Sequence, residues 1–161
     1  MHETLLHRMI AYNAGMPELT QHLIKVYQFA HLIAEGEHLD AHTQFILETA
    51  AIVHDIGIRN SLRIYGDDAG PHQEALGPGE AEAMLTSLHY DSDVIERVCY
   101  LVGHHHTYTD IDGMDYRILV EVDFLVNLFE NHATPQRICK AHETIFETKT
   151  GKMLLKTMFA L

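Results

Sequence analysis

Hydrophobic residues recur every three or four positions along most of the chain, which is the period of a helix with one buried face. The clearest case predicts a helix from residue 17 to about 35, with Leu19, Leu23 and Val26 on its buried face. Apolar and polar residues almost never alternate strictly, as they would in a half-buried strand. The sequence therefore predicts an all-α fold of six to eight helices, with the others at about 3–12, 41–55, 79–88, 91–105, 116–126, 134–146 and 151–160.

One segment interrupts this periodicity. Residues 59–79 are polar and rich in glycine, and they contain Pro71 and Pro78. This composition predicts a long loop, and a loop of that length inside a compact domain is usually functional. We therefore predict that this segment acts as a lid over the functional site. Since no repeat or linker appears elsewhere, residues 1–161 are predicted to form one domain.

The charge excludes several classes of partner. The chain has 23 acidic and 11 basic residues and a formal net charge of −12, with 14 histidines counted as neutral. An acidic surface repels duplex nucleic acid and anionic membranes, so neither is an expected partner. The sequence has no 18-residue apolar run and no signal peptide pattern, which predicts a cytoplasmic location. Cys99 and Cys139 form no CxxC motif, which argues against a thiolate zinc site.

Three ionisable residues occupy positions where the helical pattern expects a core residue. His22, His54 and Asp123 each lie three or four positions from apolar neighbours. A buried charge must pair, lose its charge or bind a metal, because burying it alone is costly. Imidazole nitrogen and carboxylate oxygen together suit zinc, manganese, iron or cobalt. Asp55 directly follows His54 and can reach the same centre.

The order of these residues resembles the H…HD…D signature of the HD superfamily of metal-dependent phosphohydrolases and phosphodiesterases. The matching segments are TQHLIKVYQFAHLIAEGE, AAIVHDIG, VCYLVGHHHTY and ILVEVDFLVNL, and together they span about residues 16–130. The resemblance implies an all-α bundle with one or two divalent ions, which could be manganese, iron, cobalt, nickel, zinc or magnesium. It implies His22, His54, Asp55 and Asp123 as ligands, with Asp55 as a bridge if two ions bind.

A second ion would need further ligands. His104, His105 or His106 could provide one, and His105 is favoured because it continues the apolar face of its helix. In dinuclear members of the family another histidine precedes a glycine, but the matching position before Gly77 holds Gln73. Glu74 and His105 are also candidates for proton transfer, and Asp55 is a candidate catalytic residue.

Phosphate recognition requires local cations even in an acidic protein. Lys25 is three residues beyond His22, and two arginines follow the His54-Asp55 pair closely. Arg117 lies less than two helical turns before Asp123. The predicted phosphate-binding residues are Lys25, Arg59, Arg63 and Arg117.

The leading hypothesis is a hydrolase that acts on the phosphate ester of a small molecule, such as a nucleotide, a phosphomonoester or a phosphodiester. A bound divalent ion lowers the pKa of its water to about 7 and so supplies hydroxide at neutral pH. Two alternatives remain open at this point. One is a di-iron oxygenase of the same type, and the other is a nucleotide-binding regulator that a metal stabilises without turnover. The sequence is also compatible with a homo-oligomer.

Overall fold

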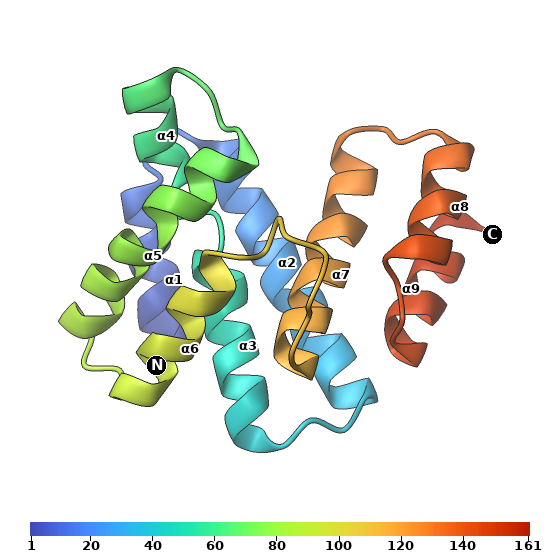
Figure 1. Cartoon of the computed structure of the whole chain (residues 1–161), viewed down its shortest axis with the longest axis horizontal. Coiled ribbons are helices and arrows are strands. Elements are labelled where there is room, and N and C mark those ends of the chain that lie inside the picture. The colour runs from blue at the N-terminus through green and yellow to red at the C-terminus, as the bar shows by residue number, and fades with distance from the viewer.

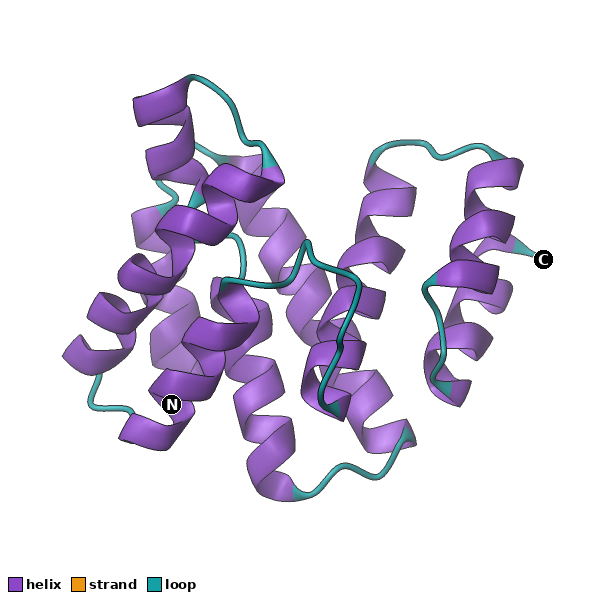
Figure 2. Ribbon diagram, in the orientation of Figure 1, coloured by secondary structure: helices purple, strands orange, loops and turns teal.

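Nine helices make up the computed structural model, which describes residues 1–161. Figure 2 shows helices joined by loops and no strand, so the predicted all-α class is confirmed. None of the helices is both long enough and apolar enough to cross a membrane. The helices are α1 (His2–Tyr12), α2 (Pro17–Gly36), α3 (Ala41–Val53), α4 (Ile58–Tyr65), α5 (Gly70–Ser87), α6 (Ser92–Val102), α7 (Met114–Glu130), α8 (Pro135–Thr144) and α9 (Lys149–Phe159).

Helix α3 lies at the centre of the fold. It packs against α1, α2, α6 and α7, and every residue from Ile46 to Val53 is buried (Figure 1). A helix that is buried on all sides lacks the usual polar face, and six of these eight residues are apolar or small. Asp40 begins the helix by accepting hydrogen bonds from the backbone N–H groups of His42 and Thr43. The residues that directly follow α3 therefore emerge inside the protein.

Helix α7 is held on two sides. One side packs against α2 and α3, and the other contacts α8 and α9, which lie at the right of Figure 1. The second contact contains Leu125, Leu128, Ile138, Phe146 and Leu155, all of them buried. Because both sides are packed, the position of α7 relative to α2 and α3 is fixed.

The prediction of a loop over residues 59–79 is wrong. This segment contains most of α4 and the first half of α5, which explains why the structure has one more helix than the six to eight expected. Pro71 lies in the first turn of α5, where its fixed φ suits a helix. Gly77 lies where a Cβ atom would come within 2.6 Å of Val102 Cγ1, so this glycine allows close packing of α5 on α6. The composition that suggested a loop instead serves helix packing.

Candidate metal centre

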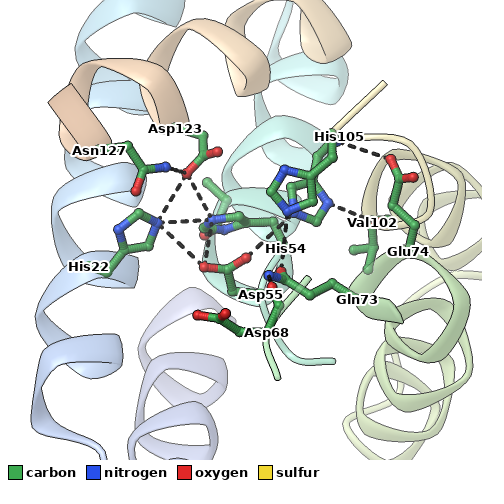
Figure 3. A network of polar contacts seen from close by, with 12 residues as sticks. His22, His54, Asp55, Asp68, Gln73, Glu74, Val102, His105, Asp123 and Asn127 are labelled. Atoms are coloured by element: carbon green, nitrogen blue, oxygen red, sulfur yellow. Dashed lines mark hydrogen bonds and ion pairs between the residues drawn. The ribbon is translucent and has the colours of Figure 1, made fainter. Parts of the chain in front are cut away.

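Three helices bring the predicted metal ligands together. His22 lies in the middle of α2, His54 and Asp55 directly follow α3, and Asp123 lies in the middle of α7. Figure 3 shows the four side chains pointing toward one another. Their exposed fractions are only 5% for His22, 0% for His54, 9% for Asp55 and 5% for Asp123. The inward positions predicted from the helical pattern are therefore confirmed for these residues.

The distances within this cluster fit a single metal ion. His22 Nε2 lies 3.1 Å from Asp123 Oδ1, 3.2 Å from His54 Nε2 and 3.5 Å from Asp55 Oδ2. His54 Nε2 lies 3.4 Å from the same Asp55 oxygen and 3.6 Å from Asp123 Oδ1. Two atoms bound about 2.1 Å from a tetrahedral ion are about 3.4 Å apart. His22, His54 and Asp123 could thus hold a metal ion, and Asp55 is placed to join them.

The outer nitrogens of the histidines fix the direction of the inner ones. His22 Nδ1 lies 2.8 Å from Glu130 Oε2, and His54 Nδ1 lies 2.9 Å from the carbonyl oxygen of Ala51. Since both partners accept hydrogen bonds, each Nδ1 carries a proton and donates it. The Nε2 lone pairs are then directed at the centre of the cluster. Metal-binding histidines in proteins are held in the same way.

The charges in the cluster favour a proton on His22 when no metal is bound. Burial lowers the pKa of His22, but the hydrogen bond with Asp123 and the charges of Asp55 and Asp123 outweigh it and raise the pKa to about 9. Burial raises the pKa of both carboxyls, but the nearby imidazoles lower that of Asp55 to about 2 and that of Asp123 well below its usual range. Two buried carboxylates thus require a positive partner, which is a proton or a metal ion.

A second group of candidate metal ligands lies on the other side of Asp55. Asp55, His105 and His106 could hold another ion. His105 Nε2 lies 3.4 Å from Asp55 Oδ1, whereas the cluster around His22 faces Asp55 Oδ2. His105 is fully buried, and its Nε2 has no hydrogen-bond partner, while its Nδ1 lies 2.8 Å from the carbonyl oxygen of Val102. The lone pair of a buried nitrogen that faces a carboxylate oxygen in this way is available to a metal ion.

The structure distinguishes between the neighbouring histidines. His104 does not join the second group, because it stacks on Tyr100 and its Nδ1 lies 2.7 Å from the carbonyl oxygen of that residue. His106 does join it, and its Nε2 lies 3.3 Å from Gln73 Oε1. Gln73 therefore contacts a candidate ligand of the second group. The sequence offered His104, His105 and His106 for a second ion and favoured His105, and the structure brings together His105 and His106.

Two further residues of α7 support the cluster and were missed in the sequence. Asn127 Nδ2 donates a hydrogen bond of 2.8 Å to Asp123 Oδ1, and Glu130 accepts one from His22. Both follow Asp123 at helical spacing, by four and by seven residues, so they lie on the same face of α7. This spacing is the signal that could have identified them.

The cluster opens into a cavity of about 410 Å³ between α2, α4, α5 and α7. This volume suits a small molecule. Five carboxylate residues line the cavity, and no lysine or arginine does. The lining comprises Gly15, Met16, Glu18, Leu19, His22, Asp55, Ile58, Leu62, Asp68, Gln73, His106, Asp123, Asn127 and Glu130.

Lys25 and Arg117 lie outside this cavity, although the sequence predicted both as phosphate-binding residues. Lys25 Nζ forms an ion pair of 2.5 Å with Glu130 Oε1, so it supports the partner of His22. Arg117 lies 3.0 Å from Glu147 Oε1 and lines a separate cavity beside the start of α9. These cations are therefore already paired with carboxylates.

Arg59 and Arg63 also lie outside the cavity. Arg59 donates hydrogen bonds to the carbonyl oxygens of Tyr12 and Ala14, at the end of α1. Arg63 donates one to Asn60 Oδ1, within α4. Their closeness to Asp55 in sequence is misleading, because the start of α4 directs both side chains away from the cluster. Arg59 instead anchors the turn that leads to Met16 at the edge of the cavity.

Glu74 has a structural contact of its own. Its Oε1 accepts hydrogen bonds from the backbone N–H of His106 at 3.0 Å and from Thr107 Oγ1 at 3.2 Å. It does not line the cavity. Glu74 therefore positions the turn that carries His105 and His106, and this contact gives it no direct access to a substrate proton.

Comparison of the chain with protein-family models, curated proteins and solved structures finds no significant match. The cluster and its cavity are therefore the basis for a functional assignment.

Glu130→Gln tests the support that His22 receives. Because the neutral amide holds the His22 N–H less strongly than a carboxylate, we expect metal affinity to fall by roughly 10- to 100-fold. Competition with a fluorescent chelator would measure the Kd. Glu143→Gln, a change of the same type at an exposed residue of α8, is the control and should leave the Kd unchanged. A Glu130 variant with the Kd of the wild type would show that this contact does not support a ligand.

Proposed function

We propose that this protein is a metal-dependent phosphohydrolase of the HD type that acts on a phosphate ester of a small molecule. The observation that carries the proposal is the cluster of His22, His54, Asp55 and Asp123, in which five interatomic distances lie between 3.1 and 3.6 Å. The order of these residues along the chain supports the resemblance to the HD superfamily. The adjoining cavity provides room for a small substrate.

A divalent ion in the cluster would lower the pKa of a bound water and withdraw charge from a phosphoryl oxygen. The protein residues have separate tasks. Asn127 orients Asp123 through its hydrogen bond, and Glu130 orients His22. Gln73 contacts His106, whose pKa is lowered by burial and by the charge of His105, so a neutral His106 imidazole is available to hold a second ion.

The charge of the cavity limits the class of phosphate ester. With five carboxylates and no lysine or arginine in the lining, only metal ions can offset the charge of a phosphate. Two divalent ions offset most of the negative charge of the five carboxylates, whereas one ion leaves an excess that would repel a phosphate dianion. A nucleoside triphosphate would bring further negative charge without a cationic partner. The cavity thus favours an ester with a single phosphate over a nucleoside triphosphate, and two bound ions over one.

The second ligand group supports one alternative function. A di-iron oxygenase also requires a pair of adjacent ions, and Asp55 has one oxygen facing each group. The two functions differ in their dependence on iron and oxygen. Product formation that requires iron and consumes O₂ would favour the oxygenase, while phosphate release under argon would favour the hydrolase.

The proposal is tested on protein purified without chelators and then loaded with manganese, iron, cobalt, nickel, zinc or magnesium. We expect inorganic phosphate to be released from at least one monoester, and the metal content to be one or two ions per chain. The Asp123→Asn variant should lose most of its bound metal and most of its phosphate release. Wild-type protein that binds none of these ions, or that binds them and releases no phosphate from any ester of a broad panel, would contradict the proposal. Tight binding of nucleotides without turnover would instead favour the regulator.

A further inference from the structure

Two carboxylates in the cavity have no partner in the protein. Glu18 lies in the first turn of α2, four residues before His22 and thus on the same helix face. Asp68 lies in the loop between α4 and α5. Both line the cavity, and neither side chain forms a hydrogen bond or an ion pair. They are also exposed, so a bound molecule can reach them.

The other acidic residues of the cavity are already engaged. Asp55 and Asp123 contact the imidazoles of the cluster, and Glu130 contacts both His22 and Lys25. Glu18 and Asp68 are thus in excess of what the metal cluster and its support require. Their negative charge adds to a cavity in which no lysine or arginine is present.

The loop that carries Asp68 is fixed rather than free. Gln73, which is only 6% exposed, donates a hydrogen bond of 2.6 Å from Nε2 to the carbonyl oxygen of Asp68. Ser61 Oγ similarly donates to the carbonyl oxygen of Asp67. Figure 3 shows Asp68 below Asp55, on the same side of the cluster as Gln73. The backbone of Asp68 is therefore held beside the cavity, and Gln73, which holds it, also contacts His106 of the second ligand group.

Four apolar side chains form another part of the cavity wall. Met16, Leu19, Ile58 and Leu62 come from the turn before α2, from α2 and from α4. Aliphatic carbon atoms of a ligand would lose contact with water against these side chains. The cavity thus combines a metal cluster, an aliphatic wall and two free carboxylates. A matching ligand has a phosphate at one end, a short carbon chain and a positive charge.

We infer that the preferred substrate is a phosphate monoester whose organic part carries an ammonium group, with Glu18 and Asp68 as its binding residues. The inference rests on the proposed function, because the metal cluster is taken as the phosphate site. Each carboxylate repels the phosphate of any ester, and its attraction to an ammonium group offsets that repulsion. An ester without an ammonium group lacks this offset. The acidic cavity therefore selects between esters of the same size by charge.

Equilibrium binding of two matched probes to the metal-loaded protein tests the inference. Phosphoethanolamine carries an ammonium group, and propyl phosphate has a methyl group in its place. We expect phosphoethanolamine to bind with a Kd roughly tenfold lower, because two partly exposed charge pairs each contribute a modest factor. The preference should shrink as salt is added, since exposed charges are screened. Calorimetry gives both Kd values without any need for turnover.

The double variant Glu18→Gln/Asp68→Asn should bind both probes about equally and should keep the metal content of the wild type. Glu96→Gln, at an exposed residue of α6 outside the cavity, is the control and should keep the preference. Equal or tighter binding of propyl phosphate by the wild type overturns the inference, as does loss of metal from the double variant. Hydrolysis of propyl phosphate without an ammonium preference would overturn this inference alone, and absence of binding to either probe would overturn it together with the proposed function.

Discussion

Asp123→Asn should remove most of the bound metal and lower phosphate release by at least about 10³-fold, since a lost metal contribution of several kcal/mol has that effect on a rate. The change preserves the size of the side chain but replaces a carboxylate with a neutral amide. Asp123 Oδ1 is the cluster atom nearest to His22 Nε2, at 3.1 Å. Its loss leaves the imidazoles without one of the two anionic ligands. Metal content by mass spectrometry and initial rates of phosphate release measure the two effects.

A matched control is available on the surface. Asp110 is exposed, lies outside the cavity and has a φ of 56°, a conformation that asparagine also adopts readily. Asp110→Asn therefore removes the same charge without strain and should keep both metal and activity. Circular dichroism would verify that Asp123→Asn remains folded. An Asp123 variant that is folded and retains the metal content of the wild type would remove Asp123 from the ligand set.

Metal affinity should rise steeply with pH above neutrality, which is the second large effect. Because the pKa of His22 is raised to about 9 in the absence of metal, an ion must displace a proton from Nε2 at any lower pH. The apparent Kd should thus fall about tenfold per pH unit, or about 100-fold between pH 6.5 and 8.5. An imidazole with the usual pKa of about 6.5 would give almost no change over this range.

Chelator competition at several pH values measures this dependence, and calorimetry in two buffers of different ionisation enthalpy counts the released protons. We expect about one proton per ion at pH 7.5. The same proton stabilises the metal-free protein. Since the folded pKa of His22 exceeds the unfolded value, its contribution is complete below about pH 6.5 and is lost as the pH rises through 9. Metal affinity that stays constant from pH 6.5 to 8.5 would show that the ion displaces no proton from an imidazole of raised pKa, and would contradict this account of His22.

The helical pattern located three of the four candidate ligands, and Asp55 followed from its place beside His54. His22 and Asp123 occupy apolar faces of long helices, and His54 follows a helix whose last eight residues are all buried, so their side chains had to point inward. Local periodicity determines which face of a helix is buried, and three inward ionisable groups imply a shared partner. The all-α class followed from the same periodicity.

The residues around the ligands could not be located in this way. Lys25 was predicted beside the substrate, but it pairs with Glu130, which is more than 100 positions away in the sequence. Arg59 was judged by its distance from Asp55 along the chain, yet the turn into α4 directs it to Tyr12 and Ala14. The partner of an exposed cation depends on tertiary neighbours, and a periodic pattern contains no information about them.

The segment 59–79 shows a different limit. Glycine and proline usually mark loops, but here Pro71 lies in a first helical turn and Gly77 lies at a close contact with Val102. The use of Gly77 depends on the packing of α5 against α6, which the sequence does not reveal. The loop before α5 also brings Asp68 to the cavity, so the wrong prediction for this segment hid one residue of the site.

The central claim is that His22, His54, Asp55 and Asp123 bind a divalent ion, and anomalous scattering from crystals grown with manganese or zinc tests it most directly. The account predicts an anomalous peak within about 2.0–2.2 Å of His22 Nε2, His54 Nε2 and the facing oxygens of both aspartates. A second peak beside Asp55 Oδ1, His105 and His106 would show that the other group is also occupied. Crystals with no anomalous peak at the cluster, and with the hydrogen bond between His22 and Asp123 retained, would contradict the claim.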